Sequence, residues 1–142
     1  DKAGAEAAFR AAIAADPQYA AAHYNLGLLL DERGDKAGAE AAFRAAIAAD
    51  PQHANAHCNR GVLLKQRGDK AGAEAAYRAA IAADPQYAMA HYNLGAILAE
   101  RGDLAGAARS FAAALKVDPS DAGAKANLQL ALRMLKEERR EA

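Results

Sequence analysis

Residues Ala20 to Pro51 read AAAHYNLGLLLDERGDKAGAEAAFRAAIAADP, and this stretch decides the fold because the chain repeats it. A second copy runs from Ala54 to Pro85, and a third copy runs from Ala88 to Pro119. Prolines keep the same period of 34 residues at Pro17, Pro51, Pro85 and Pro119. A fixed period of this size predicts a stacked array of one supersecondary unit.

Each copy is predicted to form two helices. In the first copy, one helix runs from about Ala20 to Arg33, Gly34 breaks it, and Asp35 caps a second helix. Connections this short make neighbouring helices antiparallel. The chain then divides into a lone second helix at 1–19, full repeats at 20–53, 54–87 and 88–121, and a capping helix at 122–142. We expect a single all-α array of eight helices without strands.

Composition and charge narrow the classes of function. The 142 residues carry 18 Lys and Arg against 18 Asp and Glu, so no net field attracts nucleic acid or an anionic membrane. The single cysteine, Cys58, excludes an intramolecular disulfide and fits a reducing compartment. We find no signal peptide and no apolar run long enough to span a bilayer. These features predict a cytoplasmic protein with no nucleic-acid or membrane partner.

The repeat resembles the tetratricopeptide repeat. The family pattern is a large residue, Leu-Gly, a further apolar residue, Ala, an aromatic residue and Pro. The first copy matches it at His23, Leu26, Gly27, Leu30, Ala39, Phe43 and Pro51. The chain departs from the pattern where histidine replaces the large apolar residue and where Arg60 replaces a leucine. The resemblance implies a right-handed superhelix whose concave side, lined by the first helix of each pair, holds extended peptides or partner helices.

A candidate binding groove follows from the two faces of the first helix. With 3.6 residues per turn, His23, Leu26 and Leu30 gather on a packing face, and a second face points the other way. The first two copies differ at eight of 34 positions, and five of these lie on the second face. A constant frame with a varying face is typical of a binding groove, although drift on an exposed face gives the same pattern. The predicted groove residues are Tyr24, Asn25, Leu28, Asn55, Cys58, Asn59, Val62, Lys65, Met89, Tyr92, Asn93, Ala96 and Asn127.

One residue type on this second face does not vary. Asparagine recurs at Asn25, Asn59, Asn93 and Asn127. An amide offers one acceptor and two donors, so a row of amides could pair with the backbone of an extended peptide. The row resembles the asparagine ladder in the repeats of O-linked N-acetylglucosamine transferases. The alternative is that each asparagine joins one helix to its neighbour.

The sequence offers no catalytic or metal site. His53 and His57 are four residues apart, but no carboxylate or thiol stands at ligand spacing beside them. No nucleophile has a base and an orienting partner. We therefore expect a non-catalytic scaffold without cofactor that binds a protein or peptide. Two alternatives stay open: the substrate-presenting arm of a larger glycosyltransferase-like enzyme, and a structural spacer or self-assembly element.

The two ends of the array carry further expectations. Phe9 and Ile13 precede the first full repeat, and their apolar side chains predict a weak homodimer through the first helix. At the other end, Leu128, Leu132 and Leu135 are expected to dock the capping helix onto the third copy.

Overall fold

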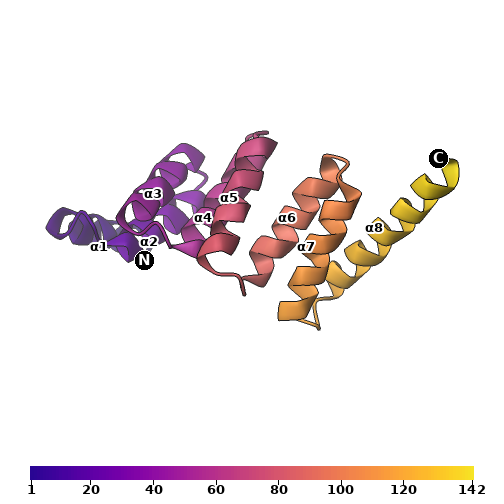
Figure 1. The fold of residues 1–142 in the computed structure, drawn as a ribbon. Coiled ribbons are helices and arrows are strands. Elements are labelled where there is room, and N and C mark those ends of the chain that lie inside the picture. The colour runs from indigo at the N-terminus through magenta and orange to yellow at the C-terminus, as the bar shows by residue number, and fades with distance from the viewer.

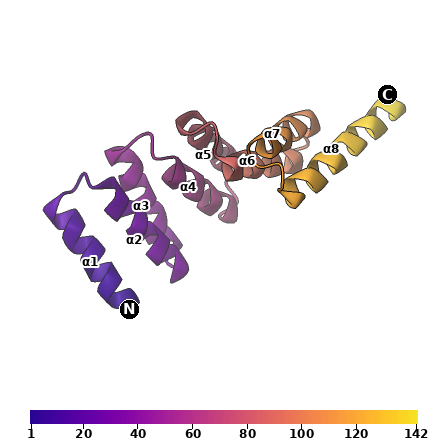
Figure 2. The same ribbon diagram turned by 90° about the horizontal axis from the view of Figure 1, so that it is seen from below.

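The computed structural model describes residues 1–142 and contains eight α-helices and no strand, which confirms the predicted helical-repeat solenoid. The helices are α1 (Lys2–Ala15), α2 (Ala20–Glu32), α3 (Lys36–Ala49), α4 (Ala54–Gln66), α5 (Lys70–Ala83), α6 (Ala88–Glu100), α7 (Leu104–Val117) and α8 (Ala122–Glu141). They follow one another along an elongated array, with the two termini at opposite ends (Figures 1 and 2). None of the helices combines the length and the hydropathy needed to cross a membrane.

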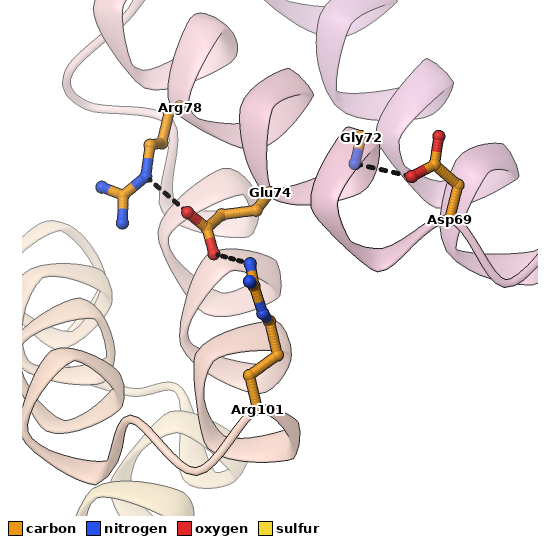
Figure 3. Close-up of polar contacts among 5 residues, drawn as sticks. All are labelled: Asp69, Gly72, Glu74, Arg78 and Arg101. Carbon is orange, nitrogen blue, oxygen red and sulfur yellow. Dashed lines mark hydrogen bonds and ion pairs between the residues drawn. The ribbon is translucent and has the colours of Figure 1, made fainter.

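Each second helix begins with an aspartate cap that packs closely on a glycine three residues later. The Asp69 carboxylate accepts a hydrogen bond of 2.8 Å from the Gly72 backbone N–H (Figure 3). A Cβ atom at Gly72 would lie only 2.7 Å from Asp69 Cγ, a separation that real Cβ atoms do not show. Asp35 and Gly38 form the same pair at the start of α3. Glycine inside these helices therefore leaves room for the carboxylate that caps them.

A second set of glycines brings the two helices of a repeat together. A Cβ atom at Gly27 would lie 2.6 Å from the Phe43 ring, and one at Gly61 would lie 2.6 Å from the Tyr77 ring. The aromatic ring of the second helix therefore packs directly on the backbone of the first. Phe43 and Tyr77 are both almost completely buried. The largest buried cluster spans α4 to α7, and a smaller one spans α2 to α4.

The histidines of the repeat lie beside the core with a hydrogen bond to the backbone. His23 Nε2 lies 2.8 Å from the Pro17 carbonyl oxygen, and His57 Nε2 lies 2.9 Å from that of Pro51. Because the carbonyl can only accept, Nε2 carries the proton and donates it. These side chains are half-buried. A histidine can replace a large apolar residue here because its polar edge has a partner.

Ion pairs join α1, α3 and α5 each to the end of the first helix that follows it. Glu74 of α5 accepts from Arg101, at the end of α6, over 2.6 Å, and it also contacts Arg78 at 3.3 Å (Figure 3). Glu40 and Arg67 make the same contact one repeat earlier, at 2.6 Å. In the three pairs that join successive helices, Glu6 with Arg33, Glu40 with Arg67 and Glu74 with Arg101, the partners are 27 residues apart.

The end helices differ from the expectations in two ways. Phe9 and Ile13 are half-buried, because α1 packs on the cluster formed by α2 and α3. Leu128 packs on the larger core cluster, as expected, but Leu132 is exposed. The expectation that Leu132 docks onto the third copy was wrong. It occupies the position of Leu30 and Leu98, and those leucines are buried in repeats where a second helix follows.

Candidate peptide-binding face

The predicted groove residues lie on one side of α2, α4, α6 and α8, which we call the inner face. Leu28 and Met89 are its exposed large apolar side chains, and Met89 is 57% exposed. Asn25 and Asn55 are exposed as well. The remaining predicted residues other than Cys58 are half-buried: Tyr24, Asn59, Val62, Lys65, Tyr92, Asn93, Ala96 and Asn127. The inner face is thus an apolar and amide surface with few free charges.

Cys58 is the exception, because its exposed fraction is 0%. It belongs to the large core cluster, and Asn93 Nδ2 lies 3.6 Å from its sulfur. Burial raises the pKa of the Cys58 thiol, although hydrogen bonds with Tyr87 and Asn93 act in the opposite direction. The expectation that Cys58 contacts a ligand was therefore wrong. A small side chain at this position lets the next repeat pack over it.

The asparagine row links neighbouring repeats. Asn59 Nδ2 donates to the Tyr24 hydroxyl over 3.0 Å, and Asn127 Nδ2 donates to the Tyr92 hydroxyl over the same distance. In each pair the amide stands 35 residues after its acceptor. These bonds are the ones expected if each asparagine joins one helix to its neighbour. Each bond uses one of the two N–H donors of the amide. The side chain therefore still has a second N–H donor and a carbonyl acceptor.

Tyr24 is fixed by its surroundings before any ligand arrives. Its ring centroid lies 5.8 Å from that of Phe43 and 4.8 Å from that of His53. Burial raises the pKa of Tyr24, while the hydrogen bond from Asn59 works against that shift. The hydroxyl therefore stays protonated at neutral pH. On the inner face, Tyr24 is thus in contact with Phe43 and His53 through its ring and with Asn59 through its hydroxyl.

A cavity of about 490 Å³ opens on the inner face between α6 and the start of α8. Met89 and Tyr92 line it, as does Tyr87 from the turn before α6. Asp118 and Asp121 add two carboxylates, and Gly123 leaves space at the start of α8. Tyr87 was not among the predicted groove residues. Its signal was an aromatic ring in the turn before each first helix, at Tyr19, His53 and Tyr87.

Lys65 is the one cation among the predicted residues, and it is already paired. Its Nζ lies 3.3 Å from Glu100, and Lys70 Nζ lies 3.5 Å from the same carboxylate. Desolvation acts to raise the pKa of Glu100, but the hydrogen bonds and charges of Lys65 and Lys70 prevail and lower it. Lys65 therefore belongs to a surface ion-pair cluster at the edge of the inner face.

One imidazole nitrogen of each histidine in the pair is engaged within the fold. His53 Nδ1 accepts from the Ala56 N–H over 3.1 Å and so caps α4. His57 Nε2 is bound to Pro51, as described above. No group of three or more His, Cys, Asp and Glu side chains in the chain could hold a metal ion. The histidines are explained by capping and packing.

A protein-family model and several solved structures resemble this chain. A family model described as "Tetratricopeptide repeat" matches residues 1–54 and 58–126. The crystal structure of MamA superposes with a TM-score of 0.85 at 24% identity, covering 96% of this chain and 80% of that one. The first repeat domain of Spaghetti (RPAP3), bound to an HSP90 peptide, gives a TM-score of 0.78 at 22% identity, with 85% and 96% covered.

A further solved structure is that of YrrB, described as a TPR protein with an unusual peptide-binding site. It superposes with a TM-score of 0.76 at 23% identity, covering 92% of this chain and 68% of that one. No curated protein matches the sequence significantly. The structural likenesses show the fold, and the family model spans most of the chain. With its helix pairs, glycine contacts and period, the chain belongs to the tetratricopeptide repeat family.

Proposed function

We propose that this chain is a non-catalytic protein-interaction scaffold that binds an extended peptide or a partner helix on its inner face, as in a concave groove. The observation that carries the proposal is the cavity of about 490 Å³ beside Met89, whose side chain is 57% exposed. An exposed methionine over a cavity is a site that can take up an apolar side chain and adapt to its shape.

The chemistry of the cavity indicates what a ligand should carry. Met89, Tyr87 and Tyr92 offer apolar contact, and the two tyrosines also offer hydroxyl groups. Asp118 and Asp121 stand at the rim. Each of these carboxylates accepts local hydrogen bonds, from Ser120 and from the Ala124 N–H respectively, and keeps further acceptor capacity. The preferred ligand is therefore a large apolar residue next to a basic one.

Two solved structures of the same fold support a peptide partner. The RPAP3 domain is bound to an HSP90 peptide, and YrrB is described as having an unusual peptide-binding site. These statements concern those proteins. They support the class of partner proposed for this chain, and the chemistry of its own cavity supports the preferred residues.

The test uses peptides selected from a random phage-displayed library on the immobilised protein. Met89→Asn places at this position the residue that Asn55 supplies in the second repeat. Ala21→Asn introduces the same residue at the corresponding position of the first repeat. Burying an apolar side chain contributes about 1.5–3 kcal/mol, so Met89→Asn should weaken the selected peptides about tenfold or more. Ala21→Asn should leave their affinity unchanged.

Two results would contradict the proposal. The library could yield no specific peptide, which favours the structural spacer. Alternatively, the selected peptides could bind both variants as well as the unchanged protein, which places their site elsewhere. Enrichment of peptides with a large apolar residue beside Lys or Arg would support the stated preference.

The other expectations about this chain remain proposals. Asn59, Asn93 and Asn127 each have a hydrogen-bond partner in the preceding repeat, so the asparagine row lends no separate support to the enzyme-arm alternative. A weak homodimer through Phe9 and Ile13 has less apolar surface available than expected, because both side chains are half-buried. Sedimentation of the Phe9→Glu variant, compared with the unchanged chain, tests that association. A cytoplasmic location and the lack of nucleic-acid or membrane partners are likewise proposed.

A further inference from the structure

A second and larger groove lies on the opposite side of α4 from the inner face. It has a volume of about 1060 Å³, and we call it the outer groove. Its floor is α4, with His57, Arg60 and Leu64, and its walls are α3 and α5. The walls include small residues such as Ala41 and Ala75 beside the charged side chains of Glu40 and Arg44. A backbone segment could therefore approach these helices closely.

The corresponding space one repeat later is much smaller. Between α5 and α7 a cavity of about 240 Å³ remains. Arg109 lines it at the position that Ala75 occupies in the outer groove. The periodic fold alone therefore does not produce the outer groove. The volume of the outer groove depends on lining residues that differ between the copies.

Arg60 is the most unusual of these residues. Leu26 and Leu94 occupy the same position in the other copies and are buried at 6% and 5% exposure. The Arg60 side chain is 29% exposed, and its Nε atom is buried without a hydrogen-bond partner. The nearest carboxylate oxygen, on Glu40, is 3.9 Å away, which is too far for a hydrogen bond. Glu40 is instead held by Arg67 at 2.6 Å.

Arg44, on the wall of the outer groove, is also without a carboxylate. In the copies on either side, the equivalent arginine pairs with the glutamate one turn before it, at 3.6 Å for Arg10 and 3.3 Å for Arg78. No carboxylate of the chain lies within 4.0 Å of Arg44. The glutamate one turn before Arg44 is Glu40, which pairs with Arg67 at 2.6 Å and lies 3.9 Å from Arg60.

We propose that the outer groove binds an acidic segment of a protein partner, with Arg60 and Arg44 receiving its carboxylate side chains. A guanidinium group presents a planar fork of donors that matches a carboxylate. The Arg60 guanidinium has no hydrogen-bonded carboxylate within the chain, and a ligand carboxylate in the outer groove can supply one. The alanine walls admit the backbone of such a segment. This surface is distinct from the inner face, so the two proposals stand or fall separately.

A protein segment fits the outer groove better than a nucleic-acid backbone. The whole chain has no net charge, so it exerts no long-range attraction on a polyanion. Glu40 and Asp69 also line the groove and would repel a continuous row of phosphates. Separate carboxylates on a flexible segment can reach the two arginines and avoid these acidic groups.

The test measures binding of fluorescein-labelled hexaglutamate by fluorescence anisotropy at low salt. Arg60→Leu restores the residue of the other two copies, and Arg60→Met is a second variant should the first alter packing. Arg44→Ala removes the wall arginine. Arg78→Ala is the matched control, because it lies at the same position one repeat later and is paired with Glu74. Urea unfolding of each variant verifies that it is folded.

We expect the unchanged protein to bind the peptide, and Arg60→Leu, Arg60→Met and Arg44→Ala to weaken it about tenfold or more. Arg78→Ala should leave the affinity within about twofold. Absence of binding by the unchanged protein would overturn the proposal, and so would an equal loss in all variants, which indicates diffuse charge attraction. Displacement by inorganic phosphate as effective as that by unlabelled hexaglutamate would assign the groove to phosphate instead.

Discussion

At the scale of single residues, the asparagine row has a structural role that can be measured. Asn59 donates to the Tyr24 hydroxyl in a half-buried setting, whereas Asn25 is exposed and makes no such bond. A net hydrogen bond contributes about 0.5–1.5 kcal/mol, so Asn59→Ala should lower the free energy of unfolding by about 1 kcal/mol. Asn25→Ala is the control and should change it by less than about 0.5 kcal/mol. Urea denaturation monitored by circular dichroism measures both.

The partner of Asn59 provides a further control. Tyr24→Phe removes the acceptor, so Asn59→Ala should have a smaller effect in that background than alone. Equal effects in both backgrounds would show that the hydrogen bond does not contribute. If Asn59→Ala leaves stability unchanged but abolishes binding of the selected peptides, the amide binds the ligand. That result would favour a row of asparagines that pairs with the backbone of an extended peptide.

A second residue-scale prediction concerns alkaline pH. Burial, with smaller contributions from Cys58 and Glu100, raises the pKa of Tyr77 from 10.0 to about 12. The folded state then retains a proton that the unfolded state releases. The stability from Tyr77 is complete below the unfolded pKa near 10 and is lost as the pH rises toward the folded pKa. Tyr77→Phe, which copies Phe43 and Phe111, should lessen the fall in the urea midpoint between these pH values.

Tyr19→Phe is the control for this titration, because Tyr19 is exposed on the surface. It should leave the pH profile unchanged. The native decline should not vanish completely in Tyr77→Phe, since burial also raises the pKa of Tyr24 and Tyr87. Identical profiles for the unchanged protein and Tyr77→Phe would contradict the assignment.

At the scale of elements, the start of each second helix couples an aspartate to a glycine. An alanine at Gly38 would collide with the Asp35 carboxylate and displace the cap. Alanine favours a helix by about 1 kcal/mol over glycine, and a cap contributes about the same, so the single change should have a small net effect. The distinctive expectation is a coupling. Asp35→Ala should cost about 1 kcal/mol in the native chain and little in the Gly38→Ala background.

Thermal unfolding of the four variants of this cycle measures the coupling. If Asp35→Ala lowers the stability equally in both backgrounds, the carboxylate still caps the helix when residue 38 is alanine. The glycine would then have a different role. Asp121 provides a useful contrast. It caps α8 through the Ala124 N–H, at a position that tolerates a side chain.

The elements also show how far sequence reasoning reaches. Period, prolines and glycines predicted the eight helices and their pairing, because each signal acts within about 34 residues. Faces of single helices were predicted from the helical turn, and this placed Met89 correctly on an exposed surface. The burial of Cys58 was missed, because it depends on where the following repeat packs. The outer groove was missed for the same reason, although Arg60 had been noted as a departure from the pattern.

At the scale of the whole molecule, the core is uneven along the array. The larger buried cluster spans α4 to α7 and includes Tyr77, Ile97 and Phe111, whereas the smaller one serves α2 to α4. In an array where each repeat contacts its neighbours, local opening reflects these local cores. Hydrogen exchange followed by mass spectrometry should therefore show the slowest exchange in α5 to α7 and faster exchange in α1 to α3. Uniform protection along the array would mean that the chain opens only as one unit.

The constant separation of the inter-repeat contacts has a consequence for how the protein is made. Asparagine–tyrosine bonds join residues 35 positions apart, and glutamate–arginine pairs join residues 27 positions apart. A nascent chain therefore needs only one further repeat outside the ribosome before the previous repeat can form its inter-repeat hydrogen bonds and ion pairs. Folding can proceed from the amino end during synthesis, since no contact waits for a distant carboxyl-terminal segment. An array built this way can lengthen by whole repeats without a slower search for its native contacts.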